Sequence, residues 1–132
     1  DIDRDGDLDL LVGGRDTGGG RPNFLFRNDI GSQNRWMAFE LVGNGDTINR
    51  DAIGTRVTVN FDNESIIREK KSSRGMYNSE DTRALHFGIG DRGCATSIEV
   101  RWPNGETFSL DMDTVVEESY LSIAYPDVIE VR

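Results

Sequence analysis

Histidine and cysteine, two residues that often carry catalysis, are scarce in this chain. Of its 132 residues, one is histidine, His86, and one is cysteine, Cys94. A single cysteine excludes a disulfide bond within the chain. The sequence identifies no catalytic partner for either residue. We therefore expect His86 to face solvent or make one structural hydrogen bond, and Cys94 to be a small buried hydrophobic residue.

Basic residues and long apolar runs are also limited. The 15 lysine and arginine residues are outnumbered by 24 aspartate and glutamate residues, which gives a formal net charge of −9. Because this charge repels phosphate groups, we expect no nucleic-acid partner and no anionic membrane surface as a partner. No apolar run approaches the roughly 18 residues of a membrane-spanning helix, so we expect no membrane insertion.

Aspartate, by contrast, is concentrated in the first nine residues. Gly6 permits a sharp backbone turn that brings later carboxylates round to the earlier ones. Two carboxylates about 4 Å apart repel by about 4 kcal/mol at an effective dielectric constant of about 20, and a hard divalent cation removes that cost. Oxygen ligands in an irregular loop favour Ca²⁺ over zinc or magnesium. The alternative is a solvated acidic turn. The converging side chains are those of Asp1, Asp3, Asp5 and Asp9.

A β-strand, and not a helix, is predicted directly after the acidic loop. From Leu8 to Val12 apolar side chains recur at every second position, and the run ends at Gly13 and Gly14. An EF-hand would instead need a bidentate glutamate at loop position 12, where this chain has Val12. Residues 23–28 follow a glycine-rich loop and supply a partner strand. The resulting single hairpin is too small to be stable alone.

The stretch DIDRDGDLDLLVGG resembles the FG-GAP repeat, also called VCBS-like, of β-propellers. The resemblance covers about one loop and its two flanking strands. It implies that Ca²⁺ is held by the four aspartate side chains named above and by the backbone carbonyl of Asp7. Since the sequence begins at the first of these ligands, we expect a free amino terminus beside the site.

From Arg35 onward the sequence predicts strands throughout, because no segment has a helical apolar period. The first of these strands is apolar on nearly both faces, so we expect it in the centre of a sheet. Hairpins are indicated across Asp62-Asn63 and across Pro103-Asn104-Gly105. The expected strands cover residues 35–41, 54–61, 65–70, 84–90, 97–102, 106–110, 120–123 and 128–131.

Two further groups of side chains are candidates for function. One is a polar segment that could form a second calcium loop, but it lacks the glycine at the sixth position and the regular spacing of the first loop, so a polar turn is favoured. It contains Asn44, Asp46, Asn49 and Asp51. The other is a candidate binding surface formed by the loop stretch 74–77 with Trp36 and Trp102. For both tryptophans we favour positions in the core.

Three separated motifs resemble the ASPIC/UnbV domain, which includes the cartilage acidic protein family. They are AIGTRVTV at residues 52–59, LHFGIG at residues 85–90 and VRWPNG at residues 100–105. That domain typically follows FG-GAP repeats in secreted or exported proteins, and the order here is the same. The resemblance implies an extracellular or periplasmic location and assigns no catalytic residues and no defined ligand.

We therefore predict an all-β protein that combines a calcium-loop β-hairpin, left from a propeller blade, with a small antiparallel β-sandwich or barrel. The predicted divisions are residues 1–31 (partial FG-GAP/VCBS-like repeat), 32–113 (ASPIC/UnbV-like β domain) and 114–132 (C-terminal strand and tail). The predicted function is a non-catalytic extracellular calcium-binding module for adhesion or for interaction with a protein or glycan. The alternatives are an accessory β domain of a larger, carbohydrate-active enzyme and a structural cap that covers the edge of a propeller.

Overall fold

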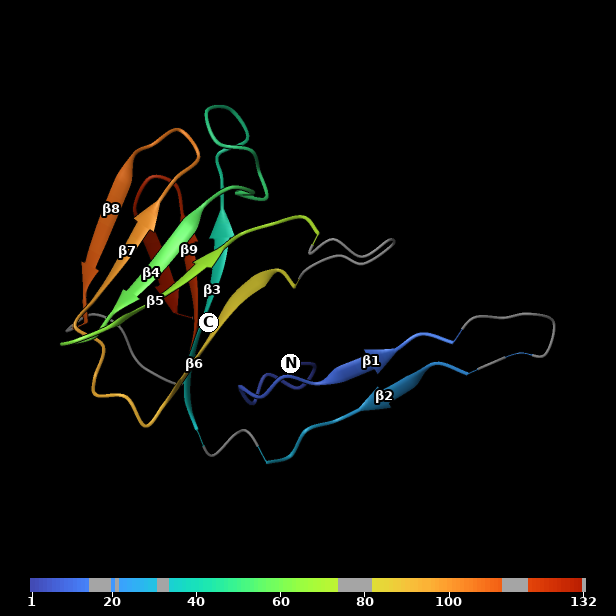
Figure 1. Ribbon diagram of the computed structural model, residues 1–132. Helices are drawn as coiled ribbons and strands as arrows, with labels where there is room; N and C mark the ends of the chain where they lie inside the picture. The colour runs from blue at the N-terminus through green and yellow to red at the C-terminus, as the bar shows by residue number, and fades with distance from the viewer. Residues whose placement is uncertain (15–19, 21, 31–33, 74–81, 113–118, 132) are drawn as a thin grey trace. The chain divides into compact units, whose positions relative to one another are not determined.

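The computed structural model describes residues 1–14, 20, 22–30, 34–73, 82–112 and 119–131. These residues form ten β-strands and no α-helix, so the predicted all-β class is confirmed. Across the described segments there is consequently no helix of the length and apolar character that crossing a membrane requires. The chain divides into two compact units, Asp1–Asn34 and Arg35–Arg132, which are described separately (Figure 1). The candidate surface stretch 74–77 lies outside the described residues.

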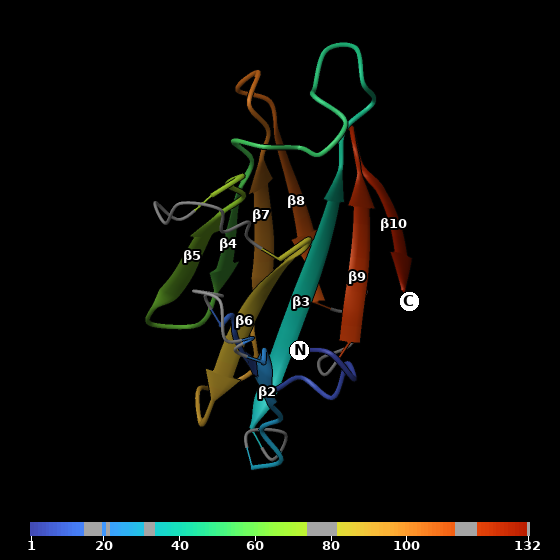
Figure 2. The same cartoon turned by 90° about the vertical axis from the view of Figure 1, so that its right-hand side faces the viewer.

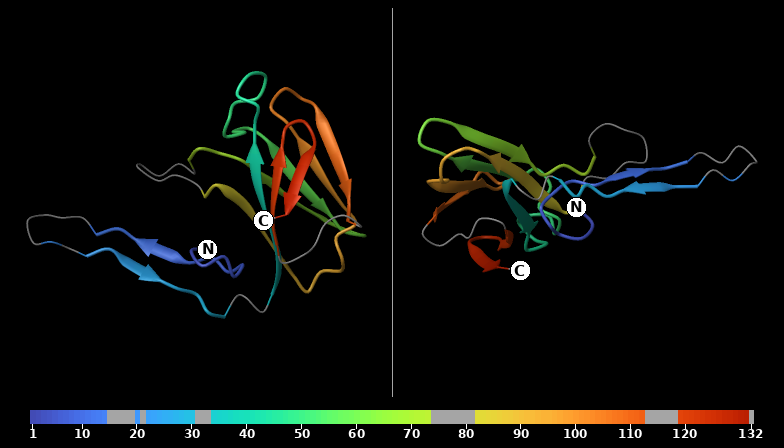
Figure 3. Two further views of the ribbon diagram at one scale, coloured as in Figure 1. Left: turned by 180° about the vertical axis from the view of Figure 1, so that it is seen from behind. Right: turned by 90° about the horizontal axis from the view of Figure 1, so that it is seen from below.

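The first unit contains a two-stranded antiparallel ribbon (Figure 3). β1 (Leu10–Val12) pairs with β2 (Phe24–Phe26), with Leu11 opposite Leu25. All six strand residues are apolar, and each is 41–70% exposed. Because successive side chains of a strand point to opposite faces, both faces of the ribbon are apolar. None of the apolar residues described in this unit is buried.

The second unit is a sandwich of two four-stranded sheets, and these do not close into a barrel. Figure 2 shows the sheet that contains β3 and β6 in front of the sheet that contains β4 and β5. The first sheet has the order β10 (Val128–Val131), β9 (Ser119–Ala124), β3 (Arg35–Val42) and β6 (Ala84–Gly90). The second has the order β5 (Ser65–Glu69), β4 (Arg56–Asn60), β7 (Ser97–Arg101) and β8 (Thr107–Asp111).

β3 lies in the interior of its sheet, as its apolar character predicts. It pairs antiparallel with β6 and parallel with β9, and β9 (red) lies beside β3 in Figures 2 and 3. The β3–β9 pair is a parallel exception in the predicted antiparallel sandwich. Parallel neighbours need a crossover connection. Here the chain passes through the opposite sheet, with β7 and β8, before β9 begins.

Alternating side chains from both sheets fill the core. Phe39 of β3 and Phe87 of β6 meet edge to face with ring centroids 5.3 Å apart, and both are fully buried. Full burial of such a side chain contributes about 1.5–3 kcal/mol to folding. The alternation of apolar and polar residues along residues 54–61 and 97–102 predicts which positions on β4, on β7 and just beyond them point inward, and these positions are buried. They are Val57, Val59, Phe61, Ile98, Val100 and Trp102.

Two of the three motifs noted in the sequence meet at one end of the sandwich. Gly54 has a φ of 94°, and its N–H donates to the carbonyl of Lys70 at 2.8 Å. A Cβ atom at Gly54 would lie 3.5 Å from the ring of Pro103, so the two motifs pack closely. The indole N–H of Trp102 donates to the carbonyl of Pro126 at 3.1 Å. These contacts fix the loop ends around a buried tryptophan.

Both tryptophans are buried, as predicted, but in different surroundings. Trp102 belongs to the core between the sheets. Trp36 stacks on His86 with ring centroids 5.9 Å apart and meets Tyr120 edge-on at 5.3 Å. His86 is partly buried in this stack, which the sequence did not indicate. The prediction that Cys94 is buried is wrong, because Cys94 is exposed in the connection between β6 and β7, and such connections run over the surface.

Candidate metal site

Two residues with positive φ shape the backbone of residues 1–9. Gly6 has a φ of 94°, as its predicted role in the turn requires, and Arg4 has a φ of 61°. A non-glycine residue in this region carries strain of about 1–3 kcal/mol. Next to them, the Asp5 carboxylate accepts a hydrogen bond from the Asp7 amide at 3.1 Å, which forms an Asx turn. Tight winding of the loop follows from these local features.

Asp9 connects the start of the loop to the chain that follows β2. Its carboxylate accepts hydrogen bonds from the backbone N–H of Ile2 at 2.7 Å and of Asn28 at 3.0 Å. These two bonds favour the ionised form and hold the pKa of Asp9 below its ordinary value of 3.8. The ammonium group of Asp1, the first residue of this chain, lies 3.7 Å from an oxygen of the same carboxylate.

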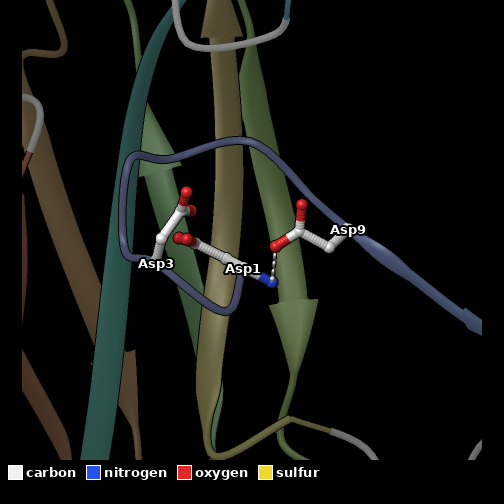
Figure 4. A group of neighbouring side chains, drawn as sticks. All are labelled: Asp1, Asp3 and Asp9. Atoms are coloured by element: carbon white, nitrogen blue, oxygen red, sulfur yellow. Dashed lines mark ion pairs between the residues drawn. The ribbon is translucent and has the colours of Figure 1, made fainter. Parts of the chain in front are cut away.

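Three of the predicted ligands converge. Carboxylate oxygens of Asp1, Asp3 and Asp9, one from each residue, lie within 4.8 Å of one another (Figure 4). Ca²⁺–O distances are about 2.3–2.6 Å, so two oxygens on one ion are at most about 5 Å apart. The side chains of Asp1 and Asp9 are only 6% and 5% exposed. The donor atoms and their spacing therefore fit a hard divalent cation such as Ca²⁺.

The other two predicted ligands are placed differently. The Asp5 side chain takes part in the Asx turn, and Asp7, predicted to act through its backbone carbonyl, is 3% exposed. Neither carboxylate belongs to the group that converges. Of the five predicted residues, the structure thus brings three side chains together and places the other two in the turn that supports them.

Sequence reasoning missed two residues that follow β2. The guanidinium of Arg27 lies 3.7 Å from a carboxylate oxygen of Asp3 and pairs with Asp29. The hydrogen bond to Asp29 and its charge, with a smaller contribution from Asp3, raise the pKa of Arg27. The other residue is Asn28, whose N–H binds Asp9. The signal was the hairpin register, which places the residues after Phe26 beside those before β1.

The second candidate loop is a polar turn, as the sequence favoured. The side-chain oxygen of Asn44 accepts hydrogen bonds from the N–H groups of Asp46 and Ile48 at 3.1 and 3.0 Å. The Asn49 side chain likewise accepts from the N–H of Ile53 at 2.8 Å. These amide side chains replace missing backbone partners, and the buried Ile48 anchors the turn to the core.

Comparison with known proteins identifies the sandwich. Residues 45–128 match the family model described as ASPIC and UnbV. The chain belongs to this family. Cartilage acidic protein 1 of Mus musculus is 30% identical over 134 aligned residues, and the same protein of Homo sapiens is 29% identical. Each alignment covers 96% of this chain, but only 19% and 18% of the relative, so the chain spans about a fifth of the length of these relatives.

The three sequence motifs lie in or beside strands of the sandwich. Residues 52–59 lead into β4, residues 85–90 lie in β6, and residues 100–105 end β7 and turn towards β8. Each motif therefore contributes strand residues to the sandwich core. The family match, at residues 45–128, covers the sandwich except β3 and most of β10, and it does not reach the aspartate loop.

Proposed function

We propose that residues 1–9 bind one Ca²⁺ ion and that the chain is a non-catalytic, extracellular or periplasmic interaction module. The observation that carries the calcium proposal is the convergence of the Asp1, Asp3 and Asp9 carboxylates within 4.8 Å. Nearby cations balance this charge only in part. The ammonium group lies 3.7 Å from Asp9, and Arg27 is shared between Asp3 and Asp29. A dication placed among the carboxylates offsets their mutual repulsion.

The exposed apolar ribbon supports the proposal that residues 1–28 are part of an FG-GAP/VCBS-type blade. Strands that are buried on both faces consist of continuous apolar runs, and the sequences of β1 and β2 are such runs. In a propeller, sheets on either side cover such strands. The calcium ion would then stiffen the loop that enters β1. The role that we propose for the calcium-bound module is adhesion or the binding of a protein or glycan.

Calorimetric titration of the chelator-treated chain with Ca²⁺ and with Mg²⁺ tests the calcium proposal. We expect one Ca²⁺ per chain and weaker Mg²⁺ binding, because an irregular loop does not provide a strict octahedron. Asp3→Asn removes one ligand and one charge, and we expect it to weaken Ca²⁺ binding by at least about tenfold. Asp46→Asn changes the net charge equally but lies in the other unit, so it should leave the affinity unchanged.

The free amino terminus requires a control of its own. Adding two residues before Asp1 converts the ammonium into a peptide group and removes a positive charge 3.7 Å from Asp9. We expect this extended chain to bind Ca²⁺ more tightly than the original. Equal Ca²⁺ binding by the wild-type and Asp3→Asn chains would contradict the proposed site.

A further inference from the structure

Positive charge is unevenly distributed over the acidic sandwich. Residues 35–132 contain 17 acidic and 11 basic residues. Nine of these basic residues are described, and six of them line two neighbouring hollows that share Lys71. Only three acidic residues line the same hollows. The basic residues are Arg50, Arg56, Arg68, Lys70, Lys71 and Arg83.

One of the two hollows, which we call the basic hollow, has a volume of about 460 Å³. It lies between the end of β3, the turn that follows β3, the end of β5 and the start of β6. Its volume is in the range of small-molecule sites, about 300–1,000 Å³. The basic hollow is lined by Glu40, Leu41, Val42, Arg50, Asp51, Ile53, Lys70, Lys71, Ser72 and Arg83.

Buried contacts hold the floor of the basic hollow in place. Lys70 is only 8% exposed, and its ammonium group donates to the carbonyls of Thr82 and Arg83 at 2.7 and 2.8 Å. The backbone N–H of Lys70 also donates to the carbonyl of Thr55 at 2.8 Å. These bonds join the end of β5 to the start of β6 and to the turn before β4. The charge of Lys70 is therefore fixed in position.

Other charges of the basic hollow are available to a ligand. Arg50 pairs with its neighbour Asp51 at 3.2 Å, but these side chains are 82% and 61% exposed, and such exposed pairs are weak. The hydrogen bond and charge of Arg50, with smaller contributions from Arg83 and Lys70, lower the pKa of Asp51. Among the described residues, Lys71 and Arg83 have no side-chain ion pair.

We propose that the basic hollow binds an acidic saccharide through a sulfate or carboxylate group. The excess of lysine and arginine selects an anion. The carboxylates of Glu40 and Asp51 would disfavour a ligand that is only anionic, whereas they accept hydrogen bonds from sugar hydroxyls. The lining thus suits a ligand that carries both an acid group and hydroxyls. This inference deepens the proposed interaction role, and its site is separate from the calcium loop.

Titration of the ¹⁵N-labelled whole chain, followed by NMR in the presence of chelator, tests the inference. The probes are glucuronic acid, glucose 6-sulfate, glucose and inorganic sulfate. We expect both acidic sugars to shift the amides of Arg50, Ile53 and Lys71. Glucose and inorganic sulfate should bind at least about tenfold more weakly, because each supplies only half of the recognised groups. Added sodium chloride should weaken the binding of the acidic sugars.

A paired variant separates the basic hollow from the general charge of the chain. The double substitution Lys71→Gln, Arg83→Gln should weaken binding of glucuronic acid by about tenfold or more. The control is Arg35→Gln, Arg92→Gln, which removes the same charge outside the hollows. Equal weakening in both double variants would overturn the proposal. The proposal would also be overturned if glucose or inorganic sulfate bound as tightly as the acidic sugars. It would likewise be overturned if an acidic peptide shifted these amides and the sugars did not.

Because chelator is present, the outcome does not depend on the calcium loop. Sugar binding without any calcium binding in the calorimetric titration would remove the calcium proposal alone. Calcium binding without sugar binding would remove this inference alone. The two failures are therefore distinguishable.

Discussion

Similar apolar residues are exposed in the hairpin and buried in the sandwich. Phe39 and Phe87 of the sandwich are 0% exposed, whereas Phe24 and Phe26 of the hairpin are 52% and 57% exposed. The sandwich has a second layer against which each sheet packs, and the two-stranded ribbon has none among the described residues of its own unit. A strand-like pattern therefore produces a core only where a second layer covers it.

Polar contacts order the hairpin unit instead. Asp5 and Asp9 accept backbone hydrogen bonds that wind the acidic loop and connect it to the residue after Arg27. Each such bond contributes about 0.5–1.5 kcal/mol, or up to about 3 kcal/mol where the acceptor is charged. The sandwich is thus stabilised by its own core, whereas the hairpin unit is stabilised by polar groups and, as we propose, by a cation.

The largest expected contrast comes from the same truncation made in each unit. Phe87→Ala should destabilise the sandwich by about 3–5 kcal/mol, because it leaves a cavity beside Phe39. Phe26→Ala should change stability by no more than about 0.5 kcal/mol, because the side chain is already exposed. Urea unfolding of both variants measures the difference. Similar losses in the two variants would show that the ribbon is covered in solution.

A close backbone approach in the sandwich gives the next effect. A Cβ atom at Gly43 would lie 2.0 Å from the carbonyl oxygen of Asn49. Gly43→Ala therefore forces the turn away from β3 and should cost about 3 kcal/mol. At Gly88 a Cβ would have no neighbour within 4 Å, so Gly88→Ala is the matched control. Thermal unfolding compares them, and equal melting temperatures would show that the turn adapts freely.

A smaller effect is expected from the polar turn. Asn44→Ala removes the acceptor for the N–H groups of Asp46 and Ile48 and should cost about 1–2 kcal/mol. Asn44→Asp keeps a side-chain acceptor at the same position and should retain most of the stability. Amide hydrogen exchange at Ile48 reports the loss directly. Unchanged exchange in the alanine variant would mean that the side chain does not hold this turn.

The smallest effect concerns two of the exposed arginine pairs, one taken from each unit. Arg27→Gln removes a positive charge 3.7 Å from Asp3 and should increase Ca²⁺ affinity by about two- to fourfold. Arg56→Gln breaks the exposed pair with Glu69 in the sandwich and should leave Ca²⁺ affinity unchanged. Calorimetric titration compares the two variants. A decrease in affinity on Arg27→Gln would mean that Arg27 supports the site instead of competing for Asp3.

Local patterns were sufficient to predict much of the sandwich. Alternation identified Val57 and Val59 as inward residues, and the Pro-Asn-Gly sequence identified the hairpin whose Gly105 has a φ of 92°. The parallel pairing of β9 with β3 was not predicted, because periodicity records which face is buried and not which distant strand lies alongside. The exposure of Cys94 was also missed, since a free cysteine is usually buried.

The candidate metal site was also predictable only in part, because local spacing does not show which distant residues lie beside the loop. The spacing predicted that the carboxylates of Asp1, Asp3, Asp5 and Asp9 converge, and all of them except that of Asp5 do. The contributions of Arg27 and Asn28 come from the far strand of the hairpin, so they depend on its register. The basic hollow is still more remote from local sequence, because four separate segments of the sandwich contribute to it.

Calcium titration of the ¹⁵N-labelled chain, followed by NMR, tests the calcium site most directly. We expect the amides of Ile2, Gly6 and Asn28 to shift together and to saturate at one Ca²⁺ per chain, because they lie in or bind to the acidic loop. Amides of the sandwich core should not move. Absence of any shift in the loop, or shifts centred instead on Asp46 and Asp51, would contradict the account.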